Sequence, residues 1–124
     1  NYLIWFEYGR SDFCRARGFS YKEMEEVDNA LLVVAEAYCR YNAPAFYEDE
    51  LIIRTKLEEI RSRSIRFVYE VIRPSDNALL SEGETLHLIT DHNKKIRSLP
   101  AQYTEKLLQT PEDTNAFPEN EAPR

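Results

Sequence analysis

The opening eighteen residues constrain the fold more than any other stretch of this chain. NYLIWFEYGRSDFCRARG contains no proline, starts with Asn1, which can cap a helix, and ends at Gly18, which can close one in a left-handed conformation. The stretch therefore predicts a helix over most of residues 1–18.

Apolar side chains cover most of the circumference of this predicted helix. One stripe at helical spacing consists of Leu3, Phe6, Phe13 and Ala16. Further apolar bulk around the first two turns comes from Tyr2, Ile4, Trp5 and Tyr8. Such a helix needs burial on more than one side, yet it is too short and too charged to cross a bilayer. We expect a sheet to wrap around it, leaving solvated only the second half, with Arg10, Asp12, Arg15 and Arg17.

The spacing changes to period two after a short helix expected over 20–27, where Ser20 and Glu23 match a capping box. Four strands are predicted, over residues 31–41, 51–60, 65–74 and 79–91, followed by a helix over 100–109. Mostly short turns join the strands, which favours an antiparallel meander. The predicted class is α+β, with the apolar face of the sheet enclosing the opening helix.

Length and charge divide the chain into a body and a tail. The 124 residues predict one domain, which we place at residues 1–110, followed by an acidic, flexible tail at 111–124. Half of the net charge of −6 lies in that tail, which has four acidic residues and one arginine. The acidic balance disfavours nucleic acid as a partner, and no membrane span or signal peptide is visible in the sequence.

The nucleophilic and metal-ligating residues form no familiar catalytic pattern. Cys14 and Cys39 are too sparse for a disulfide framework or a zinc site, which favours a reducing, cytoplasmic compartment and no metal. For Cys14 an inert role is favoured over a nucleophilic one. His87 and His92, on a strand and its following turn, form no helical metal pair, and a structural role at the strand surface or core edge is favoured for His87.

Two sets of charges leave a functional interpretation open. Glu7 lies in the most apolar part of the helix, so it is either a site carboxylate or, as we favour, a structural group that can pair with Arg10. Strand ends and turns carry a second set, which is either solvated or a rim that binds phosphate: Arg61, Arg63, Lys94, Lys95 and Arg97.

Three stretches carry a resemblance to a known family. They are NYLIWFEYGR with RARGFSY, the run CRYNAPAFYEDELIIRTKLEEIRSRSIRFVYEV, and IRSLP. They resemble, in order, the central helix, the following strands and the arginine and proline before the last helix of hotdog-fold acyl-CoA thioester hydrolases of the 4-hydroxybenzoyl-CoA thioesterase-like type. The resemblance covers about residues 1–108. It implies a hotdog fold, in which an antiparallel sheet wraps a long central helix, and subunits that pair into dimers or tetramers with active sites at the dimer interface.

The same resemblance implies site residues. The catalytic aspartate of the family lies in a segment just before the central helix, so we expect it, with other residues, upstream of Asn1. Asn1 and Tyr2, which end that motif, and Glu7 are expected to line the active site. Arg61, Arg63 and Ser64 match positions near the nucleotide end of CoA, and Arg97 is a weaker candidate there. No metal or redox cofactor is implied.

The leading hypothesis is a cytoplasmic homo-oligomer, dimer or tetramer, that hydrolyses an acyl-CoA or acyl-carrier thioester to free acid and thiol. The alternative is a hotdog module that binds acyl-CoA or an acyl carrier without cleaving it. A purely structural interaction protein, with no affinity for CoA, is the third possibility.

Overall fold

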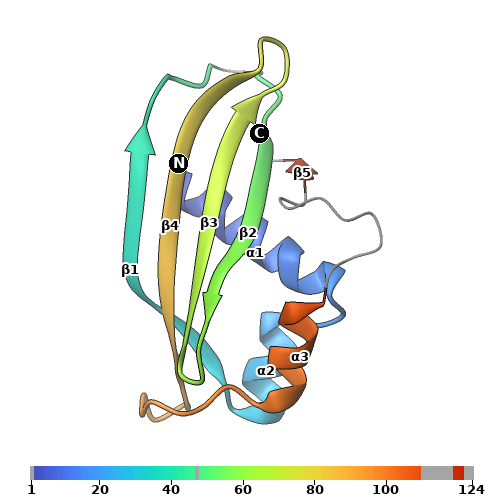
Figure 1. Ribbon diagram of the computed structural model, residues 1–124, viewed down its shortest axis with the longest axis vertical. Coiled ribbons are helices and arrows are strands. Elements are labelled where there is room, and N and C mark those ends of the chain that lie inside the picture. Colours follow the sequence, from blue (N-terminus) through green and yellow to red (C-terminus); the bar gives the residue numbers. More distant parts are fainter. Residues whose placement is uncertain (1, 47, 110–118, 122–124) are drawn as a thin grey trace.

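The computed structural model describes residues 2–46, 48–109 and 119–121, so Asn1 lies outside the described residues. The elements, in chain order, are α1 (Tyr2–Ala16), α2 (Tyr21–Asp28), β1 (Leu31–Tyr41), β2 (Ile52–Ile60), β3 (Ser64–Arg73), β4 (Ala78–Thr90), α3 (Ala101–Leu108) and β5 (Glu119–Glu121). All strand pairs are antiparallel and form one sheet in the order β1-β4-β3-β2-β5 (Figure 1).

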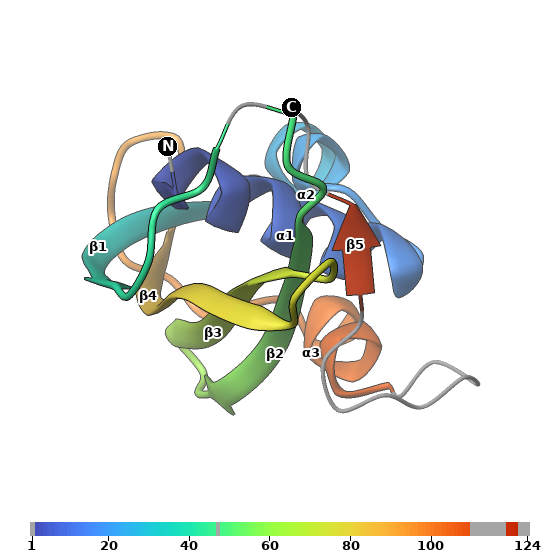
Figure 2. The ribbon, with the colours of Figure 1, turned by 90° about the horizontal axis from the view of Figure 1, so that it is seen from above.

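The sheet curves around α1, as Figure 2 shows from above. Phe6 and Phe13 of α1 are buried against the sheet, where they contact Tyr69 and Phe67 of β3. The expected α+β architecture, a long helix enclosed by the apolar face of an antiparallel sheet, is confirmed.

The predicted meander is wrong for β1. Strands β2, β3 and β4 follow one another across the sheet, but β1 pairs with β4 at the far edge instead of with β2. The ten residues 42–51 between β1 and β2 can span about 33 Å, whereas three strand spacings need only about 14 Å. The link, which the sequence marks only as a turn or crossover, is therefore long enough to pass over two strands.

The buried face of α1 also differs from the predicted stripe. Leu3 is 50% exposed and Ala16 is exposed, while Arg10, expected in solvent, is only 8% exposed. The stripe that meets the sheet is instead Tyr2, Phe6, Gly9, Arg10, Phe13 and Cys14. Gly9 sets this face, because a Cβ there would lie 2.9 Å from Ile53 and collide with the Thr55 hydroxyl.

The smaller helices follow their predicted signals. The Ser20 hydroxyl accepts a hydrogen bond from the Glu23 N–H at 3.2 Å, which confirms the capping box of α2. Pro100 precedes α3, whose buried Tyr103 packs on Phe19. Among the described residues, no helix has the length and apolar character needed to cross a membrane.

The predicted tail begins after the main sheet is complete. Glu119–Glu121 form the short strand β5, which pairs with Ile52–Arg54 at the edge of β2. The remaining residues of the predicted tail lie outside the described residues, so the division into body and flexible tail stays a prediction.

Candidate functional site

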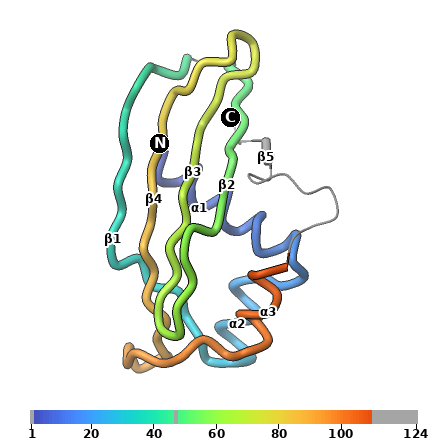
Figure 3. Tube along the Cα trace, viewed as in Figure 1, coloured from blue at the N-terminus to red at the C-terminus, as the bar shows by residue number. Residues whose placement is uncertain are grey.

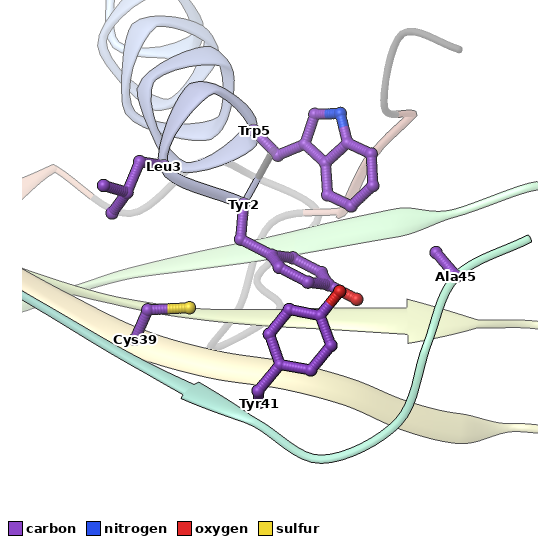
Figure 4. Close-up of a pocket in the computed structure, with 6 residues that line it drawn as sticks. All are labelled: Tyr2, Leu3, Trp5, Cys39, Tyr41 and Ala45. Atoms are coloured by element: carbon purple, nitrogen blue, oxygen red, sulfur yellow. The ribbon is translucent and has the colours of Figure 1, made fainter.

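A cavity of about 400 Å³ opens where α1 begins and β1 ends (Figure 4). Three elements meet there because the first turn of α1 packs on the last residues of β1 and on the 42–51 link that follows. The lining side chains carry no formal charge at neutral pH; they are Tyr2, Leu3, Trp5, Cys39, Tyr41 and Ala45.

Tyr2 is the centre of this cavity wall. Its ring makes edge-to-face contacts with Trp5 and Tyr41, with ring centroids 4.9 Å apart in both cases. Its hydroxyl donates a hydrogen bond to the carbonyl of Ala43 at 3.3 Å. Burial, together with the neighbouring Tyr41, raises the pKa of Tyr2 to about 12. Tyr2 is therefore a neutral hydrogen-bond donor at physiological pH and cannot act as a general base.

Cys39 brings a thiol to the same wall. It is exposed, and its Sγ lies 3.2 Å from the Ser81 hydroxyl, which donates to the carbonyl of Arg40 at 3.0 Å. The pocket thus offers aromatic walls, which favour an apolar group, and the positive dipole end of a helix, which favours negative charge developing beside that group. Within the part of the chain that the structure describes, no carboxylate or histidine lines the cavity.

Sequence reasoning missed Tyr41, Cys39 and Ala45 as members of this site. Tyr41 and Cys39 look like ordinary strand residues, and Ala45 belongs to the link whose path the sequence does not reveal. Only the position of β1 at the sheet edge, next to the start of α1, brings them together with Tyr2.

Glu7 lies two residues after Trp5 on α1, and its side chain is exposed. It is not among the lining residues, and no ion pair joins it to Arg10 within the described residues. Because the Glu7 carboxylate is exposed to solvent, it does not need the charged partner that its apolar sequence neighbours suggested. Its role in the site stays a prediction.

The predicted CoA contacts lie at the other end of the sheet. Arg61 and Arg63 are exposed and lie between β2 and β3, and Ser64 begins β3. Figure 3 shows the hairpin that joins these two strands. Ser64 pairs with Leu88, and Tyr41 pairs with Ser81, so the two sites are seven residues apart along β4, or about 23 Å. A single subunit therefore does not bring the hairpin and the cavity together.

Arg97 has structural partners near that hairpin. Its Nη1 donates to the carbonyls of Asp28 and Asn29 at 2.8 and 3.2 Å, and thus satisfies the C-terminal end of α2. Its Nε donates to the carbonyl of Ser98. These bonds give the Arg97 guanidinium a structural role that needs no ligand. Its role in binding CoA stays a prediction.

Comparison with known proteins assigns the family. A sequence model described as the thioesterase-like superfamily matches residues 1–119. The chain belongs to the thioesterase-like superfamily.

Individual members of this superfamily agree with the assignment. The acyl-CoA thioester hydrolase YbgC of Shigella flexneri is 29% identical over 110 residues, which are 88% of this chain and 81% of that protein. A hypothetical protein from Aquifex aeolicus, known from a crystal structure, is 33% identical with a TM-score of 0.79, covering 86% of this chain and 82% of that chain. The DHNA-CoA thioesterase of Staphylococcus aureus is 24% identical and shares the fold, with a TM-score of 0.80 over 86% of this chain and 72% of that one. The family resemblance and the hotdog architecture are confirmed.

At Arg10 of α1, this thioesterase-like chain holds a buried polar network that the sequence did not reveal. Arg10 Nη1 lies 3.4 Å from the Tyr69 hydroxyl, which is 2.6 Å from the Thr85 hydroxyl. The Thr85 hydroxyl in turn is 2.8 Å from His87 Nε2. His87 is fully buried, rather than on the strand surface or core edge as predicted. Burial, with the charge of Arg10 adding to it, lowers the pKa of His87 to about 3, so its ring is neutral and structural.

Cys14, on the same face of α1, is also structural. It is fully buried, and burial raises the pKa of its thiol to about 12. A thiol that stays protonated is a poor nucleophile, in keeping with the inert role predicted for it.

Proposed function

We propose that this chain hydrolyses acyl-CoA thioesters to a free acid and coenzyme A. The observation that carries the proposal is the uncharged, aromatic cavity at the first turn of α1, in a chain of the thioesterase-like superfamily. The relative YbgC is named an acyl-CoA thioester hydrolase. An acyl-carrier thioester has the same reacting group and is the second substrate form that we propose.

Each part of the cavity meets one need of this reaction. Tyr2, Trp5 and Tyr41 remove the acyl group from water, which favours its binding. The positive end of the helix dipole at the start of α1 stabilises the oxyanion that forms on the thioester carbonyl. We propose that an aspartate acts as base or nucleophile, as the family resemblance implies. Water supplies the hydroxyl of the acid, and the CoA thiolate leaves and takes up a proton.

We propose that two copies pair through the outer edge of β1. Among the described strands, β1 has a neighbour on one side only, and this edge is eleven residues long. Its exposed apolar side chains are Val33, Val34, Tyr38 and Tyr41. A long, apolar strand edge is a site for pairing with another strand, and an identical antiparallel edge is its simplest partner. The resemblance extends the proposal to a tetramer made of two such dimers.

This pairing also accounts for the distance between the cavity and the basic hairpin. When two β1 strands pair antiparallel about a two-fold axis, the start of the partner's β1 lies beside the end of β1 in this subunit. The hairpin end of the partner then lies at the same end of the assembly as the cavity of this subunit. We propose that Arg61, Arg63 and Ser64, with Arg97 in a lesser role, contact the nucleotide end of a CoA whose thioester lies in the other subunit. Exposed arginines suit the phosphates of that end.

The proposed location is a reducing compartment, the cytoplasm. Cys14 and Cys39 are both free in the structure. One of them lines the cavity, where oxidation would change the wall.

Two measurements separate hydrolysis from binding alone. Trp5 is the single tryptophan and lines the cavity, so its emission reports occupancy by a thioether analogue of acyl-CoA that cannot be hydrolysed. Release of free thiol from acyl-CoA reports turnover. Binding with turnover supports the hydrolase, and binding without turnover of any thioester supports the binding module. If the protein shows no binding and no turnover, the remaining alternative is the structural interaction protein.

A further inference from the structure

Arg73, at the end of β3, joins two turns at the cavity end of the sheet. Its Nη1 lies 3.0 Å from Asp49 Oδ2, and its Nη2 lies 3.0 Å from Asp76 Oδ2. Its Nε donates to Asp76 Oδ1 at 3.0 Å, and Nη1 also donates to the carbonyl of Pro44 at 3.3 Å. The Arg73 side chain is only 14% exposed, so these charge-assisted bonds are less screened than a surface ion pair. The donors of one guanidinium are thus divided between the β3–β4 turn and the 42–51 link.

The 42–51 link forms one wall of the candidate cavity. Ala45 lines the cavity from this link, and the Tyr2 hydroxyl donates to the carbonyl of Ala43 (Figure 4). The N–H groups of Asn42 and Ala43 donate to the carbonyl of Leu80, which holds only the beginning of the link on β4. Further along the link, Arg73 of β3 bonds to the carbonyl of Pro44 and to the carboxylate of Asp49.

The Arg73 contacts persist across neutral pH. The Phe46 N–H, at 2.7 Å, lowers the pKa of Asp49 together with Arg73. Hydrogen bonding to Arg73 likewise lowers the pKa of Asp76. Both carboxylates therefore stay ionised, and the clamp does not depend on a titration in this range.

We propose that Arg73 is a positioning residue that sets the acyl-group selectivity of the cavity, by holding the 42–51 link as its wall. The inference rests on the proposed function, because selectivity requires that the cavity takes the acyl group. Arg73 does not line the cavity; it acts through the link, where it contacts the carbonyl of Pro44, the ring of Phe46 and the carboxylate of Asp49. When its contact with Asp49 is lost, the wall is free to move away from Trp5. Small acyl groups then lose contacts, and bulkier groups gain room.

The two aspartates provide a matched pair of variants. Both lie 3.0 Å from Arg73, but only Asp49 belongs to the link. Asp49→Asn and Arg73→Met are expected to lower the ratio of kcat/KM for small over bulky acyl-CoA about tenfold, mainly through KM, as expected for a displaced positioning wall. Asp76→Asn is expected to leave that ratio within about twofold of the wild-type value. Arg73→Lys keeps the charge without the fork and is expected to lie between these results.

A second readout does not depend on turnover. Acrylamide quenching of Trp5 is expected to rise in Asp49→Asn and Arg73→Met and to stay unchanged in Asp76→Asn. Arg66→Met is a further control, because Arg66 pairs with Glu84 at 3.3 Å on strands β3 and β4, and neither residue lines the cavity. If the wild-type protein cleaves no thioester, the proposed function fails while the quenching still tests the wall. Equal quenching in Asp49→Asn and Asp76→Asn, or equal selectivity where turnover exists, would overturn the inference. That comparison decides the matter even if Arg73→Met fails to fold.

Discussion

The Phe6 ring of α1 stacks on the Tyr69 ring of β3, with ring centroids 4.5 Å apart and the planes inclined by 8°. Gly83 of β4 lies against the same Phe6 ring: a Cβ at Gly83 would be 2.5 Å from Phe6 Cε2 and would also collide with the carbonyl of Tyr38. These contacts set how deeply α1 lies in the sheet. They therefore set where the first turn of α1 meets Tyr41.

Gly83→Ala is expected to destabilise the protein by about 1–3 kcal/mol, because the added methyl overpacks a filled core. The free energy of unfolding in urea measures the change. Gly18→Asn is the control: Gly18 has a φ of +90° in open space, and asparagine tolerates the left-handed region better than other residues. Equal stability of Gly83→Ala and the wild type would contradict the tight contact between β4 and Phe6.

His87 predicts a loss of stability in acid. Its pKa of about 3 in the folded protein lies below the ordinary value of 6.5, so the unfolded chain takes up a proton first as the pH falls. The stability is fully present above pH 6.5 and is lost as the pH falls from there towards 3. Between pH 7 and pH 5 the loss from this one group is about 2 kcal/mol.

Urea unfolding of His87→Gln at several pH values tests this expectation. The variant is expected to be less stable at pH 7, because it alters a buried hydrogen bond, but to lose less of its stability between pH 7 and pH 5. An unchanged slope in His87→Gln would mean that His87 titrates normally in the folded protein.

The sequence predicts the main elements because each carries a strong local signal. Short local patterns are enough to predict the aromatic helix, the alternating strands and the Ser20 cap. The place of β1 in the sheet depends instead on the path of the 42–51 link, which no local pattern encodes. The rotation of α1 depends on Gly9, because the absence of a side chain there lets the sheet approach the helix closely. Glycine has no hydrophobic side chain that would mark this face as buried. Because of this rotation, Arg10 is buried instead of solvated as the sequence predicts. The wall formed by Tyr41 and Ala45 depends instead on the place of β1 and on the path of the link.

Val34→Lys is expected to weaken self-association at least tenfold, because it places charges in the apolar strand edge that we propose as the interface. Analytical ultracentrifugation over a range of concentrations measures the effect. Val27→Lys is a matched control, since Val27 is also an exposed valine but lies on α2. Dimers of equal strength in both variants would place the interface elsewhere.

The double variant Arg61→Ala with Arg63→Ala is expected to raise KM for acyl-CoA about tenfold, through the loss of phosphate contacts that each contribute about 0.5–1.5 kcal/mol. The same acyl group on pantetheine, which has no nucleotide, is expected to show an unchanged KM. A second double variant, Lys56→Ala with Arg66→Ala, removes two cations from the sheet instead of the hairpin. If the hairpin variant raises KM for both substrates alike, the arginines act on the fold and not on the nucleotide.

Thioester hydrolysis is measured most directly as the product balance of the protein on a panel of acyl-CoA and acyl-carrier thioesters. The panel includes short, long and aromatic acyl groups, and free thiol and free acid are quantified together. We predict that at least one thioester yields thiol and acid in equal amounts, at a rate well above its hydrolysis without protein. If no member of the panel releases thiol, the proposed hydrolase activity is contradicted, even if the cavity binds the substrate.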